Sequence, residues 1–450
     1  MKKNDVVQLL IERLGGEQGI ARHEGLTVFV RNALPGETVM ARIEKVQKNC
    51  AFAKTVEILS ASSRRREPVC PYYEKCGGCV CQHMTYEMSL QMKQERVRDA
   101  LLRIGHVEVD VPPVLGMDDP WHYRNKTSLP VGGEIGAPIL GYYAPRSHRI
   151  VDIDQCLIAM EESDSVVHVV RQWMTKFGIQ PYQELNRQGL VRHVMSRVSR
   201  EKKVMAVIVA TQRQLPHERE LVAMLRSGVE GLVSVCVSVN KRGDNVILGD
   251  NYHVLYGESR LHDTLCGFDY ALSPLSFFQI NPVQTEKLYY TALEFANLKG
   301  DELVTDLYCG AGTISLLLSG HAKKVIGVEI VEPAIRDAEE NARRNGIDNV
   351  EFHAAAAEDL LPRMVEKGLR PDVVVLDPPR KGCEESVLRA ILTAAPRRVV
   401  YVSCDVATQA RDAKILCEGG YRATRCQSVD MFCHTAHVEN VLLFERDGAK

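Results

Sequence analysis

The chain has 450 residues, of which 45% are hydrophobic, and its formal net charge is −2 at pH 7. Such a length exceeds what one hydrophobic core supports, so we expect two or three domains. The sequence shows no apolar run of membrane-spanning length and no signal-peptide pattern, which argues against a helical membrane protein and predicts a cytoplasmic location. Because the net charge is close to zero, a polyanion would need local basic patches, such as those at 64–66 or 123–126.

Residues 1–62 contain short β-branched stretches at 26–30, 37–46 and 52–59, which Gly and Pro separate. Short strands with this punctuation predict a small all-β barrel. Barrels of this kind often bind oligonucleotides, although the fold alone does not establish that function.

Residues 63–266 begin with a cysteine-rich segment. Cys70, Cys76 and Cys79 follow the spacing C-x5-C-x2-C. In a chain without a secretion signal, clustered cysteines favour a metal site over disulfides. A fourth ligand is needed, and Cys81 is the nearest in sequence, although the tight turn makes its geometry awkward. Four thiolates suit a [4Fe–4S] cluster or a tetrahedral zinc ion, and spacing does not distinguish the two.

The rest of this region mixes helical and strand-like patterns. Residues 85–105 have the apolar spacing of one helix, 161–177 are amphipathic, and 204–210 and 233–239 are strand-like. We therefore expect a mixed α/β central domain.

Residues 267–450 alternate apolar strands with amphipathic helices. This alternation predicts a doubly wound open sheet, whose ligands bind at the carboxyl ends of the strands. The first such strand ends near Asp306, and Gly310 and Gly312 then form a tight turn before a helix. Glu329 ends the next strand roughly 20 residues later, at the spacing from which an acid meets ribose hydroxyls.

The glycine turn lacks the third glycine of the dinucleotide fingerprint. Its absence disfavours a pyrophosphate ligand and favours a nucleoside such as S-adenosylmethionine. A further strand end carries the tetrapeptide DPPR, residues 377–380, in which Asp377 can accept hydrogen bonds from a ligand.

A soft nucleophile and an acid follow in the last third of the chain. Cys404 ends the apolar run VVYVS, and Glu439 precedes the apolar strand NVLLF. A thiolate that adds to C6 of uracil makes C5 nucleophilic enough to take a methyl group. A general base must then remove the C5 proton before the thiolate leaves. The sequence therefore predicts Cys404 as the nucleophile and Glu439 as the base.

Together these segments resemble the RNA uracil-C5 methyltransferases, which form 5-methyluridine. The resemblance covers nearly the whole chain, and its motifs stand in the family's order: FFQIN at 277–281, DLYCGAGT at 306–313, DPPRKG at 377–382, SCDVATQARD at 403–412 and HTAHVENVLLF at 434–444. The chain departs from the family's common pattern at Asp405-Val406 and at Cys433, beside the two catalytic candidates.

The resemblance implies a Rossmann-like, S-adenosylmethionine-dependent methyltransferase domain at 267–450 and an OB-like TRAM domain that binds RNA at 1–62. It implies Cys404 and Glu439 as catalytic residues. The resemblance also implies that S-adenosylmethionine contacts Gln279, Tyr308, Glu329 and Asp377. It further implies a [4Fe–4S] cluster whose ligands are Cys70, Cys76, Cys79 and Cys156.

We therefore expect an enzyme that methylates C5 of a uridine in structured RNA, with no membrane and no obligate protein partner. The barrel and cluster resemble the branch that acts on 23S ribosomal RNA more than the tRNA branch. Two alternatives belong to other classes, namely an RNA-binding or folding factor whose methylation is dispensable and a nicotinamide-dependent oxidoreductase.

Overall fold

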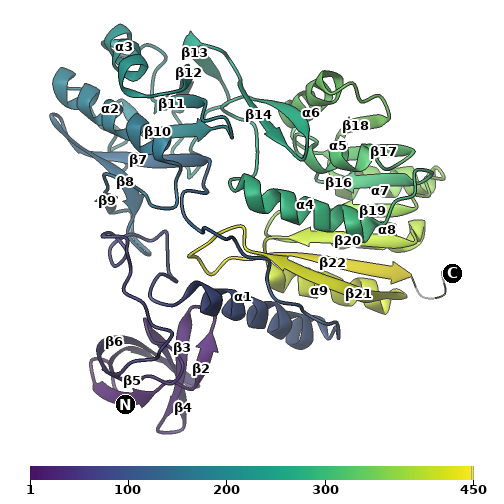
Figure 1. Ribbon diagram of the computed structural model, residues 1–450, viewed down its shortest axis with the longest axis horizontal. Coiled ribbons are helices and arrows are strands. Elements are labelled where there is room, and N and C mark those ends of the chain that lie inside the picture. Colours follow the sequence, from purple (N-terminus) through teal and green to yellow (C-terminus); the bar gives the residue numbers. More distant parts are fainter. Residues whose placement is uncertain (447, 449–450) are drawn as a thin grey trace.

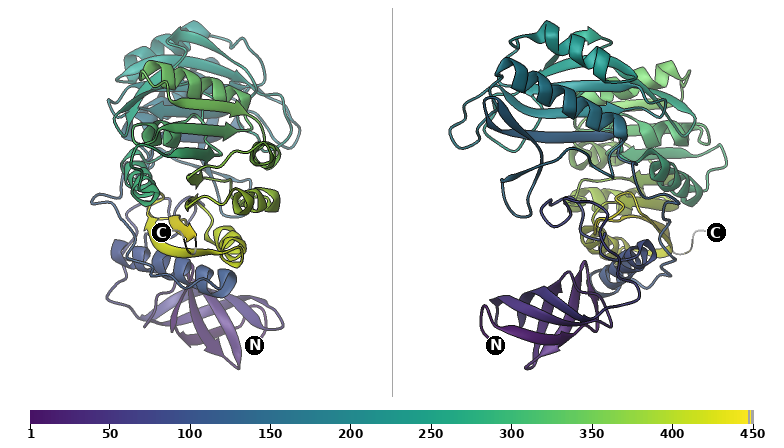
Figure 2. Two further views of the ribbon diagram at one scale, coloured as in Figure 1. Left: turned by 90° about the vertical axis from the view of Figure 1, so that its right-hand side faces the viewer. Right: turned by 60° about the vertical axis from the view of Figure 1, so that its left-hand side comes forward.

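The computed structural model describes residues 1–446 and 448. Figure 1 shows an N-terminal β domain, a central sheet with helices, and a C-terminal sheet with helices on both faces. The C-terminal sheet lies between the central sheet and helix α1, and the β domain lies beyond α1 (Figures 1 and 2).

The N-terminal domain is a curled sheet in the order β1-β5-β6-β4-β3-β2. In β5 the buried residues alternate with exposed ones, and Val39, Ala41 and Ile43 face an apolar core. The period of two is what a half-buried strand requires. The strands are β1 Val6–Leu10, β2 Arg13–Gly15, β3 Gln18–His23, β4 Leu26–Arg31, β5 Thr38–Val46 and β6 Cys50–Ser60.

The central sheet runs in the order β13-β12-β11-β10-β7-β8-β9, and helices α2 and α3 share one core with it. Strand β11 is buried along its whole length, which explains its uninterrupted apolar sequence. The elements are β7 Lys126–Glu134, β8 Ala137–Tyr143, β9 Ile150–Asp152, α2 Glu161–Phe177, β10 Val191–Val198, β11 Val204–Ala210, α3 Glu218–Gly228, β12 Leu232–Val239 and β13 Tyr252–Gly257.

A hairpin of β14 (Leu261–Leu265) and β15 (Phe268–Leu272) leads into the C-terminal sheet, whose order is β18-β17-β16-β19-β20-β22-β21. The strands from β16 to β20 are parallel, and β22 is antiparallel to both of its neighbours. The strands are β16 Leu303–Leu307, β17 Lys324–Glu329, β18 Val350–Ala354, β19 Val373–Leu376, β20 Arg398–Ser403, β21 Tyr421–Val429 and β22 Glu439–Arg446.

Helices cover both faces of this sheet. One apolar core contains residues of α4 and α5, and the core on the other face contains residues of α7, α8 and α9. This two-sided packing is the doubly wound arrangement that the alternating pattern predicts. The helices are α4 Pro282–Ala296, α5 Thr313–Ser319, α6 Glu332–Arg344, α7 Ala357–Glu366, α8 Glu385–Ala394 and α9 Val406–Glu418.

Helix α1, Tyr86–Ala100, begins at Thr85, whose side chain accepts a hydrogen bond from the Met88 backbone, and it continues into a π-helical turn, Leu101–Gly105. Val97 and Leu101 join the core that α7, α8 and α9 form on the C-terminal sheet. Helix α1 therefore packs with the C-terminal sheet, although its position in the chain lies within the expected central domain. No helix among residues 1–446 is both long and apolar enough to cross a bilayer.

Candidate active site

The carboxyl ends of the parallel strands form one edge that gathers most of the predicted site residues. Leu307 is paired with Val328 on one side and with Leu376 on the other. Because these strands are parallel, the residues that come next, Tyr308 and Asp377, stand side by side at the edge, beside Glu329 at the end of β17. Backbone bonds fix this register, since Tyr308 N donates to Val328 O at 2.8 Å.

The same edge brings Cys404 and Glu439 together from opposite directions. Strand β20 ends at Ser403, which is paired with Asn440 of the antiparallel strand β22. The residue after Ser403 and the residue before Asn440 therefore face each other, and these are Cys404 and Glu439. Since Tyr401 is also paired with Leu376, Asp377 comes directly after the end of the neighbouring strand β19, level with Val402. The charges of both Glu439 and Asp377 act on the Cys404 thiol.

Burial raises the pKa values of both acids, Glu439 and Asp377. Glu439 is 3% exposed. Burial, with a smaller contribution from nearby Asp377, raises the pKa of Glu439 to about 8, while Arg380 opposes this shift. Burial likewise raises the pKa of Asp377 to about 7. Acids with pKa values near neutrality at one sheet edge can exchange protons at physiological pH, which is typical of catalytic sites.

The Cys404 thiol is partly buried, and burial raises its pKa to about 11, with further increases from Glu439 and Asp377 and a decrease from Arg380. The thiol is therefore protonated in the free protein at neutral pH. A cation or a change of protonation at the acids would favour the thiolate. Arg380 lowers the pKa values of both Cys404 and Glu439. It belongs to the DPPR motif, but its effect on these two groups was not predicted from the sequence.

The glycine turn after β16 leaves room for a ligand. Gly310 has φ +55°, and no heavy atom lies within 4 Å of where its side chain would be. Gly312 has φ +81°, and a Cβ atom there would stand 3.0 Å from the Phe352 ring. A side chain at either position would be strained, so glycine is required for the tight turn. The Glu329 carboxylate braces the turn by accepting the Gly310 N–H at 3.2 Å and the Val331 N–H at 2.9 Å.

A fourth acid lies beneath the turn. Asp306 is fully buried, and its Oδ2 accepts a hydrogen bond from Ser315 Oγ at 2.5 Å. Its Oδ1 has no partner. Burial raises the pKa of Asp306 to about 7, and the nearby carboxyl groups of Asp377 and Glu329 add to this increase. Unpaired buried acceptors are rare, so this oxygen is available to a donor from a ligand at the edge.

Gln279 lies on the segment between β15 and α4. Its backbone carbonyl accepts a hydrogen bond from Asn125 Nδ2 at 3.1 Å, and the next residue's carbonyl accepts the Asn125 N–H at 2.8 Å. The loop before β7 therefore anchors this segment. The neighbouring Phe277 is 64% exposed. Gln279 is held at the entrance to α4, whose Tyr289 hydroxyl is 3.0 Å from Thr313 Oγ1 at the glycine turn.

The cysteine segment reaches the central domain. Cys79 and Cys156 both pack against the small core that contains Tyr123 and Cys433. Burial raises the pKa of Cys79 to about 12, and the thiols of Cys156, Cys76 and Cys70 add to this effect. The charges of the other three thiols thus act on Cys79. Cys81, whose pKa Cys79 also raises, is buried in a different core beneath α1.

None of these thiols forms a disulfide, and the Gly78 N–H donates to Cys76 Sγ at 3.4 Å. A backbone donor aimed at sulfur is an arrangement that suits a thiolate ligand. Within the described part of the chain, however, no three ligand-type side chains already stand close enough to hold a metal ion.

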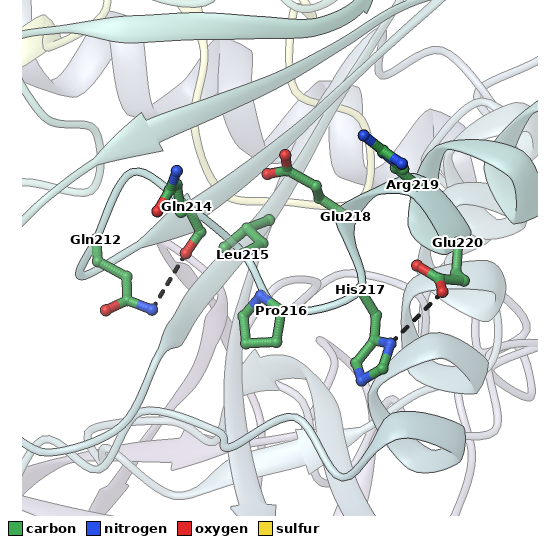
Figure 3. A pocket seen from close by; sticks show the side chains of 8 residues that line it. All are labelled: Gln212, Gln214, Leu215, Pro216, His217, Glu218, Arg219 and Glu220. Atoms are coloured by element: carbon green, nitrogen blue, oxygen red, sulfur yellow. Dashed lines mark hydrogen bonds and ion pairs between the residues drawn. The ribbon is translucent and has the colours of Figure 1, made fainter.

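A shallow surface hollow on the central domain has no part in this chemistry. Figure 3 shows its lining at the turn into α3, residues 212–220. Gln212 Nε2 donates to Gln214 O at 3.1 Å, and His217 lies 3.6 Å from Glu220. These polar groups satisfy one another, and the hollow contains none of the predicted site residues.

Comparison with known proteins identifies the family. Residues 85–447 match the family described as tRNA (Uracil-5-)-methyltransferase, and residues 2–56 match the TRAM domain. The chain belongs to the tRNA (uracil-5-)-methyltransferase family. It is an S-adenosylmethionine-dependent enzyme of this class with a Rossmann-like catalytic domain, as the sequence predicted.

Relatives match the chain over its full length. A protein of Clostridium tetani (strain Massachusetts / E88), described as an uncharacterized RNA methyltransferase, is 47% identical over 452 residues, which cover 100% of this chain and 98% of its own. A second, from Halalkalibacterium halodurans, is 45% identical over 448 residues, with coverages of 99% and 98%. The crystal structure of Pyrococcus abyssi tRNA (uracil-54, C5)-methyltransferase in complex with S-adenosyl-L-homocysteine is 26% identical, with a TM-score of 0.77 and coverages of 97% and 100%.

The two departures from the family's pattern have structural explanations. Asp405 caps helix α9, because its side chain accepts the Ala407 and Thr408 N–H groups at 3.0 and 3.1 Å. Aspartate is among the residues preferred at the N-cap position of a helix, because its side chain can accept these N–H groups. Cys433 is fully buried in the core that also contains Tyr123, where a small apolar residue fits. Neither departure disturbs the register that pairs Cys404 with Glu439.

Proposed function

We propose that the protein transfers a methyl group from S-adenosylmethionine to C5 of a uridine in RNA, through a covalent bond between Cys404 Sγ and C6 of the base. The observation that carries this proposal is the strand register that sets Cys404 opposite Glu439, at the sheet edge where Asp377 follows the neighbouring strand. A nucleophile, an acid with a raised pKa and the cofactor edge thus meet at one place.

In the proposed reaction Cys404 first loses its thiol proton to solvent, and Glu439 is in its carboxylate form. The thiolate then adds to C6, and the electron pair of the C5–C6 double bond moves so that C5 becomes nucleophilic. S-adenosylmethionine, when bound at this edge, would supply the electrophilic methyl group and would be left as S-adenosylhomocysteine. Once C5 carries the methyl group, Glu439 takes the C5 proton. The electrons of that C–H bond restore the double bond, and the thiolate leaves C6. Cys404 is regenerated, and the proton on Glu439 is returned to solvent.

The edge fits a nucleoside with a cationic sulfur. Glu329 is placed to accept from ribose hydroxyls, because each of its oxygens accepts one backbone N–H and keeps a second lone pair. Gly310 opens onto free space. We assign Tyr308, Asp377 and Gln279 as the further contacts to the cofactor. A sulfonium near the acids at 306, 377 and 439 would offset their mutual repulsion.

The substrate is RNA, in line with the family and the TRAM domain. We favour 23S ribosomal RNA over tRNA because the chain combines a TRAM domain with a cysteine cluster. The TRAM domain alone does not decide between them, since the Pyrococcus abyssi enzyme, which its description names for tRNA, covers 97% of this chain. The target uridine would have to leave its stack to reach Cys404.

We assign a [4Fe–4S] cluster to Cys70, Cys76, Cys79 and Cys156, with a structural role because the methyl transfer moves no electrons. Support comes from the donor chemistry, the packing of Cys79 beside Cys156 and the Gly78 N–H on Cys76 Sγ. Protein purified without oxygen should be brown and contain iron. A colourless protein with stoichiometric zinc would refute the cluster.

The direct test is methylation of 23S ribosomal RNA and of tRNA, both prepared without 5-methyluridine, with labelled S-adenosylmethionine. We expect wild-type protein to make 5-methyluridine in 23S RNA and the Cys404→Ala variant to make none. Labelling of tRNA alone would replace the proposed substrate by the alternative, and equal labelling by wild type and Cys404→Ala would refute the mechanism.

A further inference from the structure

The segment 430–438 joins β21 to β22 and delivers Glu439 to the site. Val429, the last residue of β21, is paired with Glu439, the first residue of β22. Asp430 therefore follows directly on the ladder partner of Glu439. Because the segment between them is irregular, its backbone carbonyls need partners from elsewhere in the protein.

Those partners come from distant parts of the chain. Residues of α1, of α4, of the cysteine segment and of the loop before β7 all donate to carbonyls of this segment. The donors to the carbonyls of residues 430, 431, 433, 434 and 436 are, in that order, Gln284 at 3.2 Å, Asn281 at 3.2 Å, Tyr123 at 3.1 Å, Cys81 at 3.0 Å and Arg96 at 2.7 Å. The segment is thus held at most of its residues.

A buried ion pair between Lys93 and Asp430 also holds the segment 430–438. Lys93 of α1 and Asp430 are both completely buried, with Nζ 2.5 Å from Oδ1. The same ammonium donates to Phe432 O at 3.1 Å, and the Tyr86 hydroxyl donates to Asp430 Oδ2 at 2.8 Å. Lys93 lies seven residues after Tyr86, so both point from one face of α1. One lysine therefore fixes both the side chain of Asp430 and the backbone two residues further on.

A buried ion pair of this kind adds little to the stability of the fold. Removing two charges from water costs about as much as their attraction returns, and well-packed apolar residues often serve equally well. What a buried pair with further hydrogen bonds can provide is one defined geometry. Here that geometry belongs to the segment that ends at Glu439.

We propose that Lys93 is a positioning residue for proton removal, which sets the place of Glu439 through Asp430 and the carbonyl of Phe432. The inference rests on the function proposed above. Proton removal from C5 is the step that follows methyl transfer, so a displaced Glu439 leaves Cys404 bonded to C6 of a methylated base. Variants of Lys93 accumulate this covalent protein–RNA adduct on ordinary RNA, whereas the wild type resolves it.

The experiment compares wild type, Lys93→Met and the double variant Lys93→Met/Asp430→Leu. The single variant leaves Asp430 buried without its partner, and the double variant removes both charges and restores a packed site. For each protein we would measure the melting temperature, kcat, KM for RNA and the fraction of protein that migrates with RNA on a denaturing gel. We expect kcat to fall by about 10²-fold in both variants, with KM unchanged within about twofold. The adduct should accumulate, even where the double variant melts at the wild-type temperature.

The matched control is Arg398→Met. Arg398 pairs with Glu302 at 3.6 Å, and their side chains are only 15% and 6% exposed. This pair lies at the amino-terminal edge of the same sheet, opposite the site. Loss of the pair should lower the melting temperature without any adduct.

Three results would overturn the proposed role of Lys93. Wild-type turnover in the double variant would show that the pair serves stability alone. Formation of the adduct by Arg398→Met would show that loss of any buried ion pair causes it. A rise in KM without adduct in the Lys93 variants would point to RNA binding in place of proton removal. If the Lys93 variants form no adduct but Glu439→Gln does, only the role of Lys93 is refuted. If Glu439→Gln also forms no adduct while the wild type methylates RNA, the assignment of Glu439 as the base is refuted as well.

Discussion

Replacement of Glu439 by Gln should stabilise the protein at alkaline pH. The carboxyl group has an ordinary pKa of 4.5, and burial raises the pKa to about 8 in the folded state. Between these values the folded protein binds a proton that the unfolded chain has lost, so the stability contributed by this group falls as pH rises. Glutamine resembles the protonated acid in shape and polarity and has no proton to lose.

The size of the effect follows from the shift. Each pKa unit corresponds to about 1.4 kcal/mol, so the wild-type acid destabilises the fold by at most roughly 4 kcal/mol at pH 8 and by almost nothing at pH 4. Relaxation of the site will reduce this limit. For a catalytic domain of this size, 1 kcal/mol shifts Tm by about 2–4 °C. We expect Glu439→Gln to melt several degrees above wild type at pH 8.

The assay is a melting curve of both proteins at pH 4.5, 6 and 8. The control is Glu445→Gln, an exposed position on the same strand β22, where the substitution should change the melting temperature little. A Glu439→Gln variant that melts below wild type at pH 8, or with a difference independent of pH, would contradict the buried, proton-binding state of Glu439.

Three further predictions concern neighbouring groups. Arg380 lowers the pKa of Glu439, so Arg380→Met should move the ascending limb of the pH–rate profile, expected near pH 8 in wild type, to higher pH; an unchanged limb would argue against Glu439 as the base. Gly312→Ala places a Cβ 3.0 Å from the Phe352 ring at φ +81°, and it should cost about 1–2 kcal/mol and weaken S-adenosylhomocysteine binding in calorimetry; unchanged binding and Tm would disprove the strained turn. Cys156→Ser should abolish the visible absorbance of anaerobically purified protein while Cys81→Ser keeps it, and the reverse result would move the fourth ligand to Cys81.

Local pattern was enough to foresee most elements of this fold. The amphipathic stretch 161–177 coincides with α2, Glu161–Phe177, which has acids in its first turn and Gly178 at its end. Such a helix is encoded by its own residues. The alternation after residue 267 likewise predicts the open sheet, because a parallel sheet with helices on both faces is the arrangement that buries such strands.

Long-range packing was harder to foresee. The stretch 85–105 does form a helix, but its last turn is π-helical, and its apolar side chains join the core of the C-terminal sheet. Nothing in the local sequence identifies that partner. For the same reason Lys93 escaped notice, since a lysine on a helix usually faces solvent and its partner Asp430 is 337 residues away.

For the site, too, some residues could be placed from local sequence and others only from the structure. The ends of parallel strands share one edge, so Tyr308, Glu329 and Asp377 could be placed together from sequence. The partnership of Cys404 and Glu439 depends on the antiparallel return of β22 and on its register with β20, which the residues alone do not specify. The influence of Arg380 on Cys404 depends on the same geometry.

The measurement that tests the central claim most directly uses RNA with 5-fluorouridine at the target site. Fluorine cannot leave C5 as a proton, so the methylated base should stay bonded to the enzyme. The assignment of Cys404 as the nucleophile predicts a complex of wild-type protein and RNA that survives denaturation, and after digestion mass spectrometry should locate the modified base on Cys404. A complex attached at another cysteine, or one formed equally by Cys404→Ala, would contradict it.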